Sequence, residues 1–386
     1  MKRIVIIAAL SVAILYVSAM AVVQAAAQSA QPTPAGQTAA PARTHFWWRD
    51  QAPGAGRGAA LPTPTKMPLI TVKGNRFVDP DGKPMLLRGL AISDPDKLAM
   101  QGHWSKDHFV KVKEMGATLV RIPVHPVAWR ERGGAEYIKL LDQAVEWSTD
   151  LGMYIIIDWH SIGNMTTGVY QDPMYDTTKE ETFGFWRAMS LRYARNNTVA
   201  FFEFFNEPAA FGRINWEAWK TIVEDEIAIV RANNAQAIPL VAGFDWAYDL
   251  TPLRLDPIAA EGIGYTIHPY SNKRPKQPSW EAAWQADFGF AAAKYPLIAT
   301  EFGGFAAPVA PGAPPPATPA AVGRGFGADP DYGPTLINFL EKRGISWTVW
   351  CFDPEWGPTL ISDWNYTLNA SGLFAKAAMA GQIQTK

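Results

Sequence analysis

The chain contains eight apolar runs, each about the length of one strand, and amphipathic segments lie between most of them. The runs occupy residues 85–92, 118–124, 153–160, 199–208, 238–244, 263–270, 296–302 and 345–352. Continuous apolar strands that alternate with helices are typical of a parallel sheet covered by helices. Eight such units in about 320 residues predict an α/β fold of the (β/α)8 TIM-barrel type.

An open, doubly wound sheet is the alternative fold, but it usually carries a glycine-rich phosphate turn after its first strand. The segment RGLAISDPD at 88–96 is not such a turn. From Leu69 onward, before the first run, apolar positions alternate and two turn signals occur, GN at 74–75 and PDGK at 80–83. This pattern predicts a short N-terminal β-hairpin ahead of the barrel.

Nearly every apolar run ends in residues that a hydrophobic core would reject. In a parallel barrel these C-terminal ends converge on one face, the face that carries the chemistry of barrel enzymes. The residues are Arg121, Asp158, His160, Asn206, Glu207, His268, Tyr270, Glu301 and Trp350. Because so many of them meet at one face, the sequence predicts an active site there.

Two of these residues, Glu207 and Glu301, are carboxylates from the fourth and seventh runs. Cleavage of a glycosidic bond needs such a pair, because one carboxyl group protonates the leaving oxygen while the other attacks the anomeric carbon or positions water. One alternative is a structural pair of acids neutralised by Arg121 and the histidines. A barrel metallohydrolase would usually carry an H-x-H motif on its first strand, which this chain lacks. A non-catalytic carbohydrate-binding barrel would have lost a carboxylate.

The motifs RIPVH, DWH, FNEP, IHPY and TEFGG, in this order, resemble glycoside hydrolase family 5, the large cellulase family of retaining (β/α)8 enzymes. The resemblance covers about residues 66–380. It implies that Glu301 is the nucleophile and Glu207 the acid/base of a double displacement that needs neither a cofactor nor a metal. It also implies a set of substrate-binding residues: Arg121, His160, Asn206, His268, Tyr270 and Trp350. Cys351 departs from the family, which often has serine there and often a cis peptide bond, so the sequence leaves the geometry of that bond open.

The substrate implied by the resemblance is a polysaccharide. Seven of the 16 tryptophans fall in or near loops on the active face, namely Trp104, Trp129, Trp159, Trp246, Trp280, Trp356 and Trp364. Several rings favour a polymer that is cleaved internally, so the prediction is an endo-β-1,4-glucanase. Endo-β-1,4-mannanase or another family 5 β-glycanase is the alternative, and endo versus exo action stays open.

A second glutamate, Glu203, lies in the same run as Glu207, in the segment FFEFFNEP. Because strand side chains alternate, Glu203, Phe205 and Glu207 should share one face, with Glu203 roughly 13 Å below Glu207. Glu203 is therefore predicted to be a buried structural acid, and Arg88 is its expected partner. By the same alternation, Asp158 should lie below His160 and orient it or Arg121.

The N-terminus reads as a targeting segment, with a basic start, an apolar run over 4–23 and small residues up to Ala27. It predicts a signal peptide over residues 1–27, with an uncleaved membrane anchor as the alternative, and thus a secreted or periplasmic protein, or one anchored facing outside the cytoplasm. Residues 28–65, rich in Ala and Pro, predict a disordered linker, in which HFWW at 45–48 is the exception. Residues 66–386 form the predicted catalytic barrel, interrupted by a proline-rich loop at 305–332.

Charge and cysteine content exclude other classes. The formal net charge is −1, so no basic field indicates a nucleic-acid partner. The single cysteine, Cys351, excludes an intrachain disulfide. We expect a monomer whose partner is its polysaccharide, with membrane contact only through an uncleaved anchor.

Overall fold

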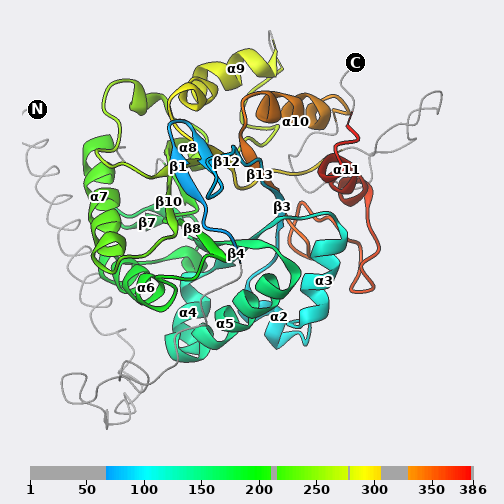
Figure 1. Ribbon diagram of the computed structural model, residues 1–386, viewed down its shortest axis with the longest axis horizontal. Coiled ribbons are helices and arrows are strands. Elements are labelled where there is room, and N and C mark those ends of the chain that lie inside the picture. The colour runs from blue at the N-terminus through cyan, green and yellow to red at the C-terminus, as the bar shows by residue number, and fades with distance from the viewer. Residues whose placement is uncertain (1–66, 210–214, 277–278, 306–328, 384–386) are drawn as a thin grey trace, which may run out of the picture. The chain divides into compact units, whose positions relative to one another are not determined.

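Eight parallel strands close into a barrel, as the sequence predicts (Figure 1). The computed structural model describes residues 67–209, 215–276, 279–305 and 329–383. In their order around the barrel, the strands are β3 (Arg88–Ala91), β4 (Leu119–Val124), β5 (Tyr154–Trp159), β8 (Val199–Glu203), β10 (Ile238–Ala242), β11 (Gly264–Ile267), β12 (Leu297–Ala299) and β13 (Ser346–Val349). Each predicted run contains one of these strands.

Helices surround the strands (Figure 1). Several of them begin at a Ser, Thr or Asn whose side chain accepts a hydrogen bond from a backbone N–H of the first turn, as at Ser105, Thr178 and Asn215. The α-helices are α2 (Pro95–Met100), α3 (Lys106–Glu114), α4 (Pro126–Arg132), α5 (Gly134–Leu151), α6 (Lys179–Arg192), α7 (Trp216–Ala232), α8 (Phe244–Ala247), α9 (Trp280–Asp287), α10 (Tyr332–Lys342) and α11 (Ala370–Met379). Short 3-10 helices are η1 (Pro173–Tyr175), η2 (Thr251–Arg254) and η3 (Gly289–Ala293).

The barrel interior consists of an apolar layer below a polar one. Leu119, Ile156 and Phe201 belong to the cluster that fills the lower interior, whereas the residues that follow them in sequence pack with the helices. Two residues further along each strand, the inward positions carry Arg121, Asp158 and Glu203. Since β5 and β8 pair Asp158 with Glu203, these two carboxylates lie at the same height.

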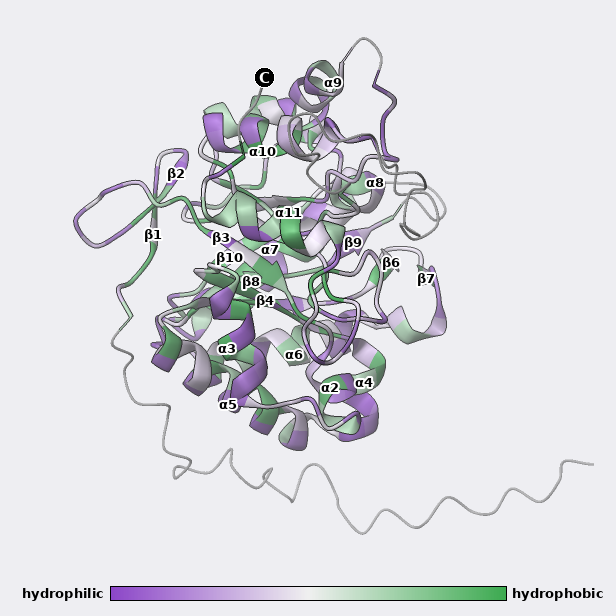
Figure 2. Cartoon of the chain, turned by 90° about the vertical axis from the view of Figure 1, so that its right-hand side faces the viewer, coloured by the Kyte–Doolittle hydropathy of each residue, from purple (hydrophilic) through white to green (hydrophobic). Residues whose placement is uncertain are grey.

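A short hairpin, β1 (Thr71–Lys73) and β2 (Arg76–Val78), precedes the barrel, as predicted. Phe77 of β2 packs its ring edge-on against Phe201 of β8, with 5.0 Å between centroids, so the hairpin covers the lower apolar layer. Figure 2 shows this hairpin at one end of the strands and the small sheet of β6 (Ile162–Asn164), β7 (Val169–Tyr170) and β9 (Glu207–Pro208) at the other. The end with β9 is the C-terminal end of the barrel strands.

The predicted signal peptide, the linker with its HFWW segment and most of the proline-rich loop lie outside the described residues. Those three assignments therefore stay predictions. Within the described ranges, no helix combines the length and the apolar character that crossing a membrane requires.

Candidate active site

The barrel brings all eight predicted site residues to its C-terminal end. Arg121 lies on β4, His160 follows β5, and Asn206 and Glu207 follow β8. The others come from the opposite half of the barrel: His268 and Tyr270 follow β11, Glu301 follows β12, and Trp350 follows β13. Together with Asp158, Glu203 and Thr300, these eight residues form one network of hydrogen bonds, ion pairs and ring contacts, described below.

Arg121 is the centre of the polar layer, and its side chain is fully buried. Its Nε donates to Glu203 at 2.6 Å, and one terminal nitrogen donates to Glu301 at 2.8 Å. The other terminal nitrogen donates to Asn206 Oδ1 at 2.6 Å and lies 3.0 Å from Asp158. Although burial works against the charged form, these carboxylates raise the pKa of Arg121 above its ordinary value.

Glu301 receives two donors from the protein. Arg121 binds its Oε2, and the Tyr270 hydroxyl donates to its Oε1 at 2.8 Å. Burial and the nearby carboxylates Glu301 and Glu207 raise the pKa of Tyr270 well above its ordinary value, so Tyr270 stays a donor. Two donors of this kind stabilise a carboxylate and hold its orientation.

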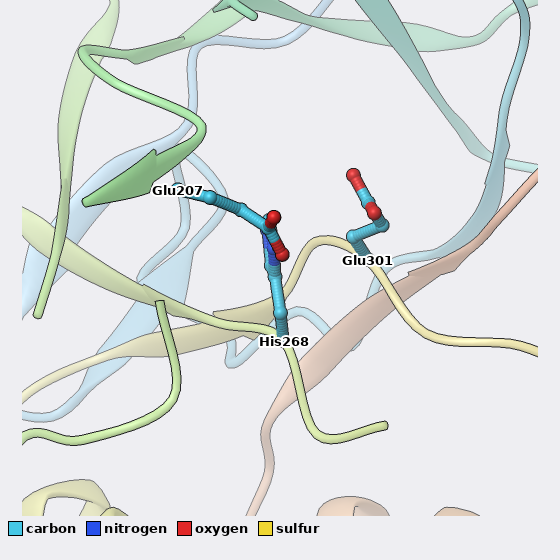
Figure 3. A group of neighbouring side chains, drawn as sticks. All are labelled: Glu207, His268 and Glu301. Atoms are coloured by element: carbon cyan, nitrogen blue, oxygen red, sulfur yellow. The ribbon is translucent and has the colours of Figure 1, made fainter. Parts of the chain in front are cut away.

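Glu207 faces Glu301 and contacts His268 (Figure 3). His268 Nδ1 lies 2.9 Å from Glu207 Oε1, and the ring is fully buried. Burial lowers the pKa of His268, but the charge of Glu301 and the hydrogen bonds to Glu203 and Glu207 raise it overall. Glu207 and Glu301 are 8% and 7% exposed, whereas Glu203 is 0% exposed, so the first two can meet a substrate and Glu203 cannot.

The spacing of the two carboxylates is short. An oxygen of Glu207, an oxygen of Glu301 and a nitrogen of His268 all lie within 4.8 Å of one another. Retaining glycosidases place their carboxyl groups about 5–5.5 Å apart, and inverting ones about 6.5–9.5 Å apart to admit a water. An oxygen pair within 4.8 Å is compatible with the retaining separation, in which one carboxylate attacks directly.

The same three side chains are close enough to ligate a cation, and within the described ranges they form the only such group. Both ring nitrogens of His268 are already engaged, since Nδ1 contacts Glu207 and Nε2 lies 3.1 Å from Thr300 Oγ1. A metal bound here would have to break one of these hydrogen bonds. The donor set therefore fits a pair of hydrogen-bonded acids better than a metal centre.

Glu203 is buried, as predicted, but the expected partner was wrong. Arg121 binds it, and Thr266 and Thr300 donate to its other oxygen at 2.9 and 2.6 Å. Arg88 instead pairs with Glu341 of α10 at 2.7 Å, because it lies lower on its strand and its side chain leaves the barrel. Burial alone would raise the pKa of Glu203, yet Arg121 and His268 lower it to about 2.

The alternation argument for FFEFFNEP was also wrong in one step. Strand β8 ends at Glu203, and the chain then leaves regular strand geometry. Phe204 packs on Trp186 of α6 and Phe205 on Trp219 of α7, so two consecutive side chains face the helices. This irregularity, not strict alternation, turns Asn206 and Glu207 into the site.

A row of rings forms another wall of the site. His160 stacks on Trp350 with 5.2 Å between centroids and 3° between planes, and its Nδ1 lies 2.6 Å from Asp158. Burial and the neighbours His125, Arg121 and His268 lower the pKa of His160 well below its ordinary value. Asp158 thus contacts both residues that the sequence named as alternatives, His160 and Arg121. The Trp350–Cys351 peptide bond, which the sequence left open, is cis.

Gly303 explains how Trp350 can come so close to the segment that carries Glu301. A Cβ at this position would lie 2.6 Å from the Trp350 carbonyl oxygen, nearer than real Cβ atoms come. Position 303, the second residue after Glu301 in TEFGG, needs a glycine because the backbone just after β13 passes directly beside it.

Two site features escaped the sequence reasoning. His125, which packs beside His160 with 4.5 Å between ring centroids, follows β4 and could have been found from its strand-end position in RIPVH. The second is a left-handed turn at Asp245–Ala247, for which the sequence carries no glycine signal. Trp356, one of the tryptophans that the sequence assigned to the active face, does lie beside Trp350, with 13° between the ring planes.

A buried carboxylate pair at the C-terminal end of a (β/α)8 barrel, with a stacking tryptophan, defines the class of barrel glycosidases. The chain belongs to the cellulase family, glycosyl hydrolase family 5, whose model matches residues 78–355. This confirms the predicted family and fold.

Known proteins of this family resemble the chain to different degrees. A β-glucanase from Saccharophagus degradans, whose crystal structure contains cellotetraose, shares 41% identity at a TM-score of 0.79, over 88% of this chain and all (100%) of that one. The catalytic domain of a Thermobifida fusca endoglucanase shares 20% identity at a TM-score of 0.63, over 81% of this chain and 97% of that one, which shows the fold. An endoglucanase from Clostridium saccharobutylicum is 25% identical over 331 residues, which are 82% of this chain and 66% of that protein. The chain spans only 37% of a related endoglucanase A from Evansella cellulosilytica.

Proposed function

We propose that this protein is a retaining endo-β-1,4-glucanase, with Glu301 as nucleophile and Glu207 as acid/base. The observation that carries the proposal is the pair of partly exposed carboxylates with oxygens within 4.8 Å of each other. Their surroundings differ in a way that fits two roles. Glu301 is held by two donors, Arg121 and Tyr270, whereas one oxygen of Glu207 contacts His268.

In the first step, an oxygen of Glu301 attacks the anomeric carbon of a sugar stacked on Trp350. Glu207 delivers its proton to the glycosidic oxygen as the bond breaks. Because Oε1 of Glu207 contacts His268, Oε2 is the oxygen left to carry that proton. The products are a glycosyl ester on Glu301 and a free leaving sugar.

In the second step, Glu207 is ionised and removes a proton from water, which attacks the same carbon and releases Glu301. Asn206 supports both steps. Its Oδ1 accepts from Arg121, so its Nδ2 is a buried donor that lacks a partner among the described residues. A sugar 2-hydroxyl is the acceptor that this donor fits, and such a bond strengthens in the transition state.

The choice of β-1,4-glucan rests on similarity. The Saccharophagus degradans β-glucanase, 41% identical, was crystallised with cellotetraose, a β-1,4-glucan fragment. Curated relatives carry the name endoglucanase. The proposal includes export from the cytoplasm, supported by the basic and apolar pattern of residues 1–27.

Reducing-end release from carboxymethylcellulose, glucomannan and galactomannan, measured side by side, tests the substrate. Carboxymethylcellulose should be the best substrate. A preference for galactomannan would show that the enzyme is a mannanase and not a glucanase. Glu207→Ala and Glu301→Ala should both abolish turnover, while Glu217→Ala, an exposed residue of α7, should not. Azide should restore turnover of an activated aryl glycoside only to Glu207→Ala. Rescue of Glu301→Ala with retained stereochemistry would reverse the two roles.

A further inference from the structure

A left-handed turn lies beside the proposed acid/base, and its geometry is unusual. Asp245, Trp246 and Ala247 have φ values of 57°, 55° and 56°, although none of them is glycine. L-residues rarely adopt this conformation, and three in succession persist only where surrounding contacts hold them. Backbone strain of this kind clusters at functional sites, where it holds a functional group in place.

Contacts from three segments hold the turn. The Trp246 indole donates to Gln171 at 2.9 Å, and the Ala247 carbonyl accepts from the backbone of His268 at 2.8 Å. Arg274 donates to the Asp245 carboxylate at 3.0 Å. The fourth contact comes from Lys273, whose Nζ donates to the Asp245 carbonyl at 2.9 Å and lies 4.7 Å from the centre of the Trp246 ring.

The turn and Lys273 lie on the Glu207 side of the site. The turn belongs to α8, which packs against β9, the strand that carries Glu207. Around the barrel, β10 and β11 are the strands next to β8 on one side, whereas β13 with Trp350 is directly opposite β8. A chain that has one sugar on Trp350 and its glycosidic oxygen at Glu207 therefore continues toward Trp246 and Lys273.

Lys273 has donors to spare. An ammonium carries three N–H groups, and within the described part of the chain only the Asp245 carbonyl accepts from it. Its side chain is half-buried, and burial lowers its pKa below the ordinary value, although the charges of Glu207, Asp245 and Glu301 partly offset this effect. Its backbone N–H donates to the Tyr270 carbonyl at 3.1 Å, and the Tyr270 hydroxyl donates to Glu301, so Lys273 lies next to the residues that contact the two carboxylates.

We propose that Lys273 binds the sugar on the leaving-group side of the scissile bond, with its ammonium donating to a hydroxyl of that sugar. The left-handed turn at Asp245–Ala247 holds the ammonium in place. Lys273 is then a residue that selects for a sugar leaving group over other leaving groups. This inference rests on the proposed glucanase function.

The test compares two substrates that differ on the leaving-group side. Cleavage of cellopentaose releases a sugar as the leaving group. Cleavage of 2,4-dinitrophenyl β-cellobioside releases 2,4-dinitrophenolate, which offers no sugar hydroxyl to Lys273. Loss of a hydrogen bond from a charged donor should lower kcat/KM of Lys273→Met on cellopentaose about 10- to 100-fold. On the aryl glycoside the same variant should stay within about twofold of wild type, since only the leaving sugar is affected.

A matched control lies in the same loop. Lys276 lies over Trp280 at the same 4.7 Å, but its side chain is 50% exposed and it pairs with Asp329 and Asp331. Lys276→Met should leave both substrates unchanged. Lys273→Arg, which keeps the charge, should retain more cellopentaose activity than Lys273→Met. If the methionine variant does not fold, Lys273→Gln replaces it in the same comparison.

A second readout is the partition of the glycosyl-enzyme between water and an added sugar acceptor. Lys273→Met should lower the yield of transfer to cellobiose, because the acceptor occupies the position of the leaving sugar. The rate at which water hydrolyses the glycosyl-enzyme should stay unchanged, because that step involves no leaving sugar. Equal losses on both substrates, or unchanged cellopentaose hydrolysis, would overturn the inference. If wild type cleaves neither substrate, the proposed function itself has failed.

Discussion

Replacing Glu203 by glutamine should destabilise the barrel without removing any group that meets the substrate. The carboxylate is fully buried and accepts from Arg121, Thr266 and Thr300. Its pKa falls from an ordinary 4.5 to about 2, a difference of about 2.5 units. At about 1.36 kcal/mol per unit, the ionised group contributes about 3 kcal/mol at neutral pH. Breaking one partner of a buried pair costs about 3–5 kcal/mol, which agrees.

The melting temperature converts this free energy into a measurement. A barrel of about 320 residues has an unfolding entropy of about 0.7 kcal/mol/K, so about 3 kcal/mol corresponds to a loss of about 4–5 °C. Calorimetry at pH 7 should show this loss for Glu203→Gln. Since a lowered folded-state pKa stabilises above the unfolded value and loses its effect as pH falls through the folded one, the difference should shrink between about pH 4.5 and pH 2.

Activity measurements separate Glu203 from Glu207. Folded Glu203→Gln enzyme should keep far more turnover than Glu207→Gln, which should melt close to wild type and be nearly inactive. A Glu203→Gln variant that melts within about 1 °C of wild type at pH 7 would refute the reasoning. It would mean that Arg121 is fully balanced by Asp158 and Glu301 alone.

Three further predictions use other parts of the chain. Glu226 of α7 is fully buried, and neither of its oxygens has a hydrogen-bond partner among the described residues. Burial raises its pKa well above the ordinary value, so the folded protein loses stability as pH rises above about 4.5. Glu226→Met should therefore raise the melting temperature at pH 7 and hardly at pH 4. A protein that begins at Thr65 should keep full activity on soluble substrate, and a large loss would mean that residues 45–48 act on the barrel. Proton NMR of the first product should show the retained anomer, and an inverted product would contradict direct attack by Glu301.

Much of the fold and site was predictable because both depend on local pattern. Each apolar run is long enough for one strand, and a polar residue at the end of a parallel strand has only one face to occupy. Arg121, Glu207 and Glu301 therefore meet whatever the details of packing. The family motifs add roles to these positions, and the structure adds the hydrogen bonds that make those roles chemically reasonable.

The parts that were not predictable depend on the relative heights of strands and on breaks in regular geometry. Arg88 and Arg121 both lie on strands next to one another, yet β3 pairs Ala91 with Arg121, so Arg88 is three residues lower. No sequence pattern gives that offset. Likewise, FFEFFNEP alternates on paper, but the chain turns after Glu203. Asp245–Ala247 adopts its left-handed turn because of contacts with distant residues such as Gln171.

Their surroundings explain why two glutamates so close in sequence can differ so much. Burial would raise the pKa of Glu203, yet Arg121 and His268 lower it to about 2, and Thr266 and Thr300 also donate to its carboxylate. Glu203 is therefore a fully buried anion whose hydrogen bonds are all made within the protein. Glu207 lies beyond the end of β8, is 8% exposed, and contacts His268 through Oε1. The break in strand geometry after Glu203 thus separates a glutamate that holds Arg121 in place from one that can meet a substrate.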